Sequence, residues 1–272
     1  MNYKRIIAIV ISVICIILLI FSFLTWKSKI DNVKAGAKII DSTQNELVET
    51  KDIVSPTKDR SDSLSRTTVE GALKNADENV QNLVLNRFYS KQKVQLLIVG
   101  SNSMEDGAPG YATLLTNALT DTYGDFIETD ALPFDGTSKQ FIEEKMLDID
   151  WTIGYDLVLL EPFTLHNNGK VIIEDEHRHI QAFEQKVLEE VPDAIVILQP
   201  SHPFFQANFY LIQIDSLEKF AARRGYPYIN HWTAWPATTD PALDNFLTED
   251  NSPNSEGAKA WASSLITYFT GK

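Results

Sequence analysis

Five short apolar runs, separated by longer segments of helical periodicity, set the pattern of the chain after residue 93. The runs cover 94–100, 125–130, 155–161, 194–199 and 226–230. Between them, apolar residues recur at the three- and four-residue spacing of a helix with one buried face. Continuously apolar strands that alternate with helices are typical of a parallel sheet. The pattern therefore predicts one α/β domain, with a five-stranded parallel sheet and helices on both faces.

The helices expected between these strands are recognised by an apolar face or by a residue that ends a helix. In the segment 111–119, the apolar residues fall on one face of an expected helix. In the segment 180–191, they fall on one face of a second expected helix. A third helix is expected to end at Gly225, because glycine adopts the left-handed conformation that closes a helix. A last helix starts near Ser255, and one more helix leads the domain over about 69–89.

The start of the chain follows a different pattern. Residues 6–25 carry no charge and are mostly apolar, and about 20 such residues let a helix cross the hydrocarbon core of a membrane. Lys4 and Arg5 favour a cytoplasmic amino terminus. Signal-peptide cores are shorter, at about 7–15 residues. We therefore predict a retained transmembrane anchor over 1–30, with the rest of the chain outside the membrane.

A polar segment connects this anchor to the domain. Residues 31–66 are rich in Ser, Thr, Asp and Lys and include "SPTKDRSDSLSRTT". This composition is typical of a linker. We expect the segment to hold an α/β domain over 67–272 away from the membrane.

Charge and cysteine content narrow the possible functions. The chain carries a formal net charge of −13, so it would repel nucleic acid, and we expect no nucleic-acid partner. Its one cysteine, Cys15, lies in the apolar run, which leaves the domain without a disulfide or thiolate chemistry. An exported domain of this kind suits a bacterium with a single membrane. We place the protein in the cell membrane and expect no cofactor.

Polar residues gather where the predicted strands end, and ligands of open α/β sheets bind beyond these carboxyl ends. Of the five histidines, His166, His202 and His231 lie just after the third, fourth and fifth strands. The other two, His177 and His179, open a helix and are expected to be solvated. Three histidines at one edge favour a polar site there.

The motifs at this edge resemble those of the SGNH, or GDSL-like, hydrolase family over roughly 94–270. In "SNSMEDG", Ser103 falls on the family's nucleophile and Gly107 on the glycine four residues later. Gly136 in "FDGTS" resembles the second-block glycine, and Asn167 in "EPFTLHNNG" resembles the third-block asparagine. The resemblance implies a three-layer, flavodoxin-like fold and ester cleavage. It assigns the nucleophile to Ser103 and the oxyanion hole to the Gly136 amide and the Asn167 side chain.

The final block departs from the family pattern. "SPNSEGAKAWA" keeps the Pro-Asn pair and the later glycine, but Ser252 stands at the histidine position and Glu249 at the aspartate position. A serine hydroxyl is a weak nucleophile and needs a base within hydrogen-bond reach. Ser103 therefore needs a replacement base, for which we consider His231 or His202.

Several alternatives stay open at this point. A different register places Asn102 on the nucleophile position. The stretch "HWTAWP" suits either a sugar-facing rim or a packed aromatic loop. A metal site built from His166, His202 and His231 is a weaker alternative, because no close ligand spacing such as H-E-x-x-H supports it.

The leading hypothesis is a membrane-anchored, extracytoplasmic serine ester hydrolase of the SGNH type. By resemblance, its expected substrate is an O-acyl group, such as acetyl, on a cell-envelope glycan. The alternative is a catalytically degenerate domain of the same fold that binds a glycan or a partner protein, since fold alone does not fix function.

Overall fold

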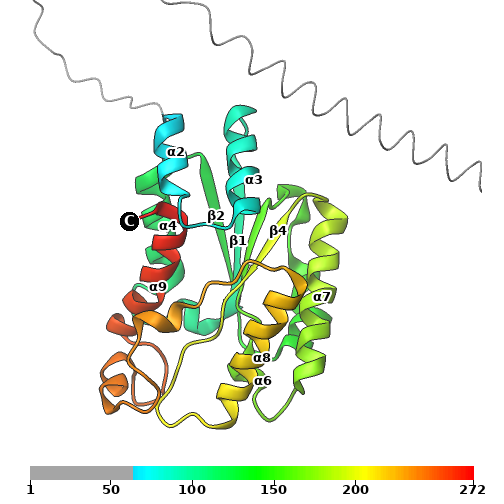
Figure 1. Ribbon diagram of the computed structural model, residues 1–272. Helices are drawn as coiled ribbons and strands as arrows, with labels where there is room; N and C mark the ends of the chain where they lie inside the picture. The colour runs from blue at the N-terminus through cyan, green and yellow to red at the C-terminus, as the bar shows by residue number, and fades with distance from the viewer. Residues whose placement is uncertain (1–63) are drawn as a thin grey trace, which may run out of the picture. The chain divides into compact units, whose positions relative to one another are not determined.

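The computed structural model describes residues 64–272 (Figure 1). The predicted anchor over 1–30 and most of the predicted linker over 31–66 lie outside these residues. Within 64–272, no helix is long and apolar enough to cross a membrane.

Four parallel strands form the sheet, in the order β2-β1-β3-β4. They are β1 (Val94–Ser101), β2 (Ile127–Phe134), β3 (Leu157–Leu160) and β4 (Ile195–Leu198). The predicted fifth strand is reduced to a single parallel bridge between Leu198 and Tyr228. Pro227 can accept a hydrogen bond there but has no N–H to donate. The chain then turns away, because the amide of His231 already bonds the carbonyl of Ile229.

Helices and helical turns fill the connections. The α-helices are α2 (Arg66–Ala72), α3 (Glu78–Tyr89), α4 (Tyr111–Tyr123), α5 (Ser138–Gln140), α6 (Thr164–Asn167), α7 (Ile173–Glu190), α8 (Phe209–Arg224) and α9 (Ser255–Thr270). The other helical elements are η1 (Asn102–Met104), η2 (Phe141–Lys145), η3 (Met146–Asp148), η4 (Trp151–Ile153), η5 (His231–Ala234) and η6 (Pro241–Phe246).

Two of the predicted helix boundaries are confirmed, and one predicted helix is wrong. Gly225 closes α8 with a φ of 77°, and α9 begins at Ser255. The helix predicted over 69–89 is instead two helices, α2 and α3. The second begins after Asp77, whose amide and carboxylate both hydrogen-bond the hydroxyl of Tyr268 on α9.

The two faces of the sheet bury two separate cores. Leu96 and Ile98 point to a core formed with α2, α3, α4 and α9, and Figure 1 shows these helices on one side of the sheet. Leu97 and Val99 point the opposite way, toward α7 and α8. Alternation along β1 follows from the two-residue period of a strand. The three-layer α/β arrangement is thus confirmed, with four strands rather than five.

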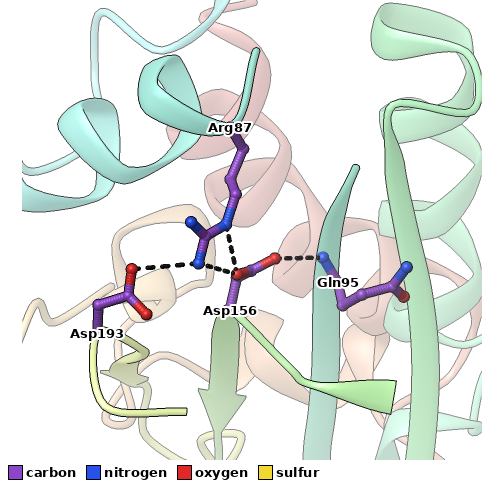
Figure 2. A network of polar contacts seen from close by, with 4 residues as sticks. All are labelled: Arg87, Gln95, Asp156 and Asp193. Atoms are coloured by element: carbon purple, nitrogen blue, oxygen red, sulfur yellow. Dashed lines mark hydrogen bonds and ion pairs between the residues drawn. The ribbon is translucent and has the colours of Figure 1, made fainter. Parts of the chain in front are cut away.

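A buried ion pair fastens α3 to the amino ends of the strands (Figure 2). Arg87 Nε donates to Asp156 Oδ1 at 2.8 Å, and the guanidinium also lies 3.1 Å from the carboxylate of Asp193. Asp156 is 5% exposed and also accepts the backbone N–H of Gln95 at 3.0 Å. This network lies at the end of the sheet opposite the strand ends that carry the candidate site.

Candidate active site

The carboxyl ends of the strands carry an open pocket of about 610 Å³. It is built from the loops after β1, β2, β3 and β4 and from the loop before α9. Its polar lining includes Ser103, Asp135, His166, His202, Asp250 and Ser252. The structure thus brings Ser103 together with two of the histidines singled out from the sequence.

Ser103 sits in the short helical turn η1, directly after β1. Its exposure is 8%, whereas the neighbouring Asn102 is exposed, and both residues line the pocket. The buried carboxylate of Glu161 holds the start of this turn by accepting the backbone N–H of Ser101 at 2.7 Å. Gly107, three residues beyond the turn, has a φ of 99° that favours glycine. A Cβ at Gly107 would lie only 2.6 Å from the side chain of Ala258.

His166, on α6 after β3, pairs with a carboxylate from the loop after β2. Its Nε2 lies 3.3 Å from Asp135 Oδ1. Its Nδ1 is buried and has no hydrogen-bond partner among the described residues. The Asp135 side chain is 77% exposed, and the contact is an ion pair. An imidazole beside a carboxylate at one nitrogen, with the other nitrogen free, resembles the arrangement of a general base. The sequence places His166 just after the third predicted strand, but it gives no sign of the pairing with Asp135.

His202, in the loop after β4, is 2% exposed and lines the same pocket. Its Nε2 bonds the carbonyl of Asn251 at 2.9 Å, which fixes the final-block loop beside Ser252. Its Nδ1 has no partner among residues 64–272. Burial lowers the pKa of His202 to about 4, so the ring is neutral near neutral pH but is a weak base.

His231 does not reach the pocket and is fully buried. Its Nε2 donates to the carbonyl of Pro200 at 2.8 Å, and its Nδ1 accepts the indole N–H of Trp235 at 3.1 Å. The ring stacks on Trp261, with centroids 4.5 Å apart. The structure therefore corrects the sequence-based choice of His231 as a base. In "HWTAWP", the buried His231 and Trp235 belong to a packed aromatic loop.

Asn167 is fully buried and does not line the pocket, and its side chain bonds other groups. Its Nδ2 donates to the carbonyl of Pro162 at 3.2 Å and to Glu176 Oε2 at 2.6 Å, while its Oδ1 accepts the amide of Ser138 at 2.9 Å. Both amide protons are used, so the expected role in the oxyanion hole is not supported. Burial raises the pKa of its partner Glu176 to about 8.

Gly136 directly follows the pocket residue Asp135 and is not itself part of the pocket lining. A Cβ at this position would lie 2.5 Å from the Phe134 ring, so the tight approach requires glycine. In the final block, Ser252 lines the pocket, whereas Glu249 is exposed and does not.

The remaining histidines are half-buried, which corrects the expectation that both are solvated. His177 stacks on Phe220 at a centroid distance of 4.1 Å, and His179 Nδ1 bonds the hydroxyl of Ser138 at 2.9 Å. Among the described residues, no group of three or more His, Cys, Asp or Glu side chains is placed to hold a metal ion.

Comparison with known proteins finds similarity in structure but not in sequence. No protein-family model matches the chain, and no curated protein matches it. Among solved structures, TesA aligns with a TM-score of 0.53 at 15% identity, over 64% of this chain and 97% of its own. A protein assigned to the lipolytic G-D-S-L family, from Desulfitobacterium hafniense DCB-2, aligns with a TM-score of 0.51 at 17% identity, over 65% and 99%.

An acetylxylan esterase from Geobacillus stearothermophilus aligns with a TM-score of 0.52 at 11% identity, over 65% of this chain and 94% of its own. These alignments cover nearly the whole of each neighbour. The described residues therefore have the fold of the SGNH, or GDSL-like, hydrolases.

Proposed function

We propose that the protein is an SGNH-type serine ester hydrolase with Ser103 as its nucleophile. The observation that carries this proposal is one pocket lined by Ser103 and by the His166–Asp135 pair. It lies at the carboxyl ends of the strands, where ligands of open α/β sheets bind.

The proposed reaction proceeds in two steps. The Ser103 hydroxyl attacks the ester carbonyl and passes its proton to His166 Nδ1, while Asp135 orients the imidazole through Nε2. The C–O bond to the alcohol then breaks, and the alcohol leaves with that proton. Water, deprotonated by the same imidazole, hydrolyses the acyl-enzyme and restores the serine. The amides of Ser103 and Gly136 are the proposed donors to the oxyanion, each worth roughly 3–4 kcal/mol in known sites.

His166 is favoured over His202 as the base for two reasons. It has a carboxylate partner, which stabilises the imidazolium formed during the reaction. His202 has a backbone carbonyl in the corresponding place, and its pKa of about 4 makes it a poor acceptor of a serine proton. His202 is assigned instead to holding the final-block loop.

The proposed substrate is an O-acyl group, such as acetyl, on a cell-envelope glycan. The pocket is open and mainly polar in its lining residues, and solved structures of similar fold include acetylxylan esterases. In Figure 1, α2 lies at the end of the sheet opposite α6, which borders the pocket. Within the described residues, the pocket therefore lies away from residue 64, where the described chain begins.

The test is hydrolysis of p-nitrophenyl acetate by the purified full chain. Ser103→Ala and His166→Ala should each lower kcat/KM by about 10²-fold or more, while His202→Ala should lower it less than about tenfold. Ser263→Ala, on α9 and outside the pocket, is the matched serine control. Equal activity of Ser103→Ala and wild type would refute the assignment, provided that circular dichroism shows both folded.

A second function is favoured by the serine at the histidine position of the final block. On this alternative, the pocket binds a glycan or a partner protein without turnover. It predicts no hydrolysis of any ester by the wild type, together with measurable binding of an envelope glycan.

A further inference from the structure

We propose that the pocket selects esters that carry a positive charge, an inference that rests on the proposed function for the same site. Three carboxylates line the pocket: Asp106 from the loop after β1, Asp135 from the loop after β2, and Asp250 from the loop before α9. Lys170 is the one lysine or arginine in the lining. Leaving the two histidines out of the count, three carboxylates and one ammonium carry two net negative charges.

These carboxylates surround a built site and are not merely an acidic surface. His202 is 2% exposed, lines the pocket, and keeps Nδ1 without a hydrogen-bond partner in the described residues. Ser103 is 8% exposed in the same lining. A buried polar atom without a protein partner calls for a group from outside the described residues, either a ligand or a water.

Two of the carboxylates are available to a ligand. Within residues 64–272, neither Asp106 nor Asp250 forms an ion pair, whereas Asp135 forms one with the imidazole of His166 and adds its charge to the pocket from there. The chain as a whole carries a net charge of −13. A cleft lined by one sign of charge concentrates ligands of the opposite sign.

The size of the preference follows from Coulomb's law. At about 8 Å in a medium like water, one net charge changes the binding of a monovalent ion by roughly twofold. Two net negative charges therefore favour a cationic ester over a neutral ester of the same shape by about fivefold. The preference should shrink as salt rises from about 20 mM to about 500 mM, because Asp135 and Asp250 are exposed and Asp106 is partly exposed.

The positive charge could belong to the alcohol or to the acyl group, and two substrate pairs separate these sources. Acetylcholine and 3,3-dimethylbutyl acetate differ only by the charge on the alcohol. The p-nitrophenyl esters of 4-(trimethylammonio)butyrate and 5,5-dimethylhexanoate differ only by the charge on the acyl group. The two esters of a pair have the same shape and are hydrolysed by the same protein. The ratio of their kcat/KM values, measured with the full chain, therefore reports the effect of the charge alone.

We expect a ratio of about five in at least one pair, falling to about two in Asp106→Asn or Asp250→Asn. Asp121→Asn is the matched control, because it removes the same charge from an exposed site on α4 outside the pocket lining, and it should leave the ratio unchanged. A ratio near one in both pairs, with the neutral esters hydrolysed, overturns this inference and leaves the proposed function intact.

If no ester is hydrolysed, the proposed function fails, and the inference is judged by binding. Choline and 3,3-dimethylbutanol are then titrated into the full chain by calorimetry. Tighter binding of choline, weakened by Asp106→Asn or Asp250→Asn, supports a cation-selective pocket. Equal or undetectable binding of the two compounds overturns it.

Discussion

Replacing His231 should destabilise the fold but leave ester hydrolysis nearly unchanged. In His231→Ala, the carbonyl of Pro200 and the indole N–H of Trp235 lose their partner, and both residues are buried. Each unsatisfied group costs about 1–3 kcal/mol. Loss of the stack on Trp261 adds about 0.5–1.5 kcal/mol. The free energy of unfolding should therefore fall by about 2.5–7.5 kcal/mol, a large part of the 5–15 kcal/mol typical of a domain.

Urea unfolding of the full chain, followed by tryptophan fluorescence, measures this loss. His231→Phe is the matched variant, because it keeps a ring against Trp261 and removes only the hydrogen bonds. It should lose less than the alanine variant. Below its melting temperature, His231→Ala should hydrolyse p-nitrophenyl acetate within about threefold of wild type, far from the 10²-fold effect of losing a base.

The result that would refute this reasoning is the reverse combination. If His231→Ala unfolds at the wild-type urea concentration but loses activity by about 10²-fold, His231 acts on the substrate. The hydrogen bonds described here would then not account for its role.

Two further predictions concern buried charges away from the pocket. Glu176 should make the protein less stable at alkaline pH: burial raises its pKa from 4.5 to about 8, so the folded state holds the proton more tightly. Its contribution to the free energy of unfolding, on the order of a few kcal/mol, is present below pH 4.5 and lost as pH rises through 8. Thermal melts should show a falling melting temperature over this range. Glu176→Gln should make the melting temperature depend less on pH. Arg87→Met strands the Asp156 carboxylate, which is 5% exposed, and should cost about 3–5 kcal/mol in urea unfolding. Lys219→Met, which breaks an exposed pair with Asp215, should cost less than about 1 kcal/mol.

The sequence predicts most of the fold because buried apolar residues recur along the chain with the period of the helix or strand that contains them. The apolar runs that become β1 and β4 are recognisable from continuous hydrophobicity, and Gly225 marks a helix end by its backbone freedom. The run over 226–230 has the same apolar character, yet pairs at only one residue. Apolar composition indicates that a segment is buried, but hydrogen-bonding partners decide whether it is a strand.

The site is less predictable from the sequence. The direction in which a side chain points, and the groups that it bonds, depend on residues far away in the chain. His202 and His231 both follow strand ends, but His231 turns inward to stack on Trp261, 30 residues later. The pair of His166 and Asp135 joins loops that flank β1 only because the strand order is β2-β1-β3. Hydrophobic periodicity does not give that order, so the pair is visible only in the structure.

Asn167 illustrates the same limit for the motif-based assignment. Its place after β3 agrees with the resemblance, but its side chain bonds Glu176 from the following helix. A buried carboxylate nearby was not apparent from the third-block motif. The local sequence therefore predicts that Asn167 follows β3, but it does not predict which groups the side chain bonds.

Labelling with a fluorophosphonate probe tests the central claim most directly. The probe should form a covalent adduct on the full chain, and peptide mass spectrometry should place that adduct on Ser103. His166→Ala should slow the labelling, because the serine loses its base. A folded wild-type protein that leaves Ser103 unmodified, or that carries the adduct on another residue, would contradict the account.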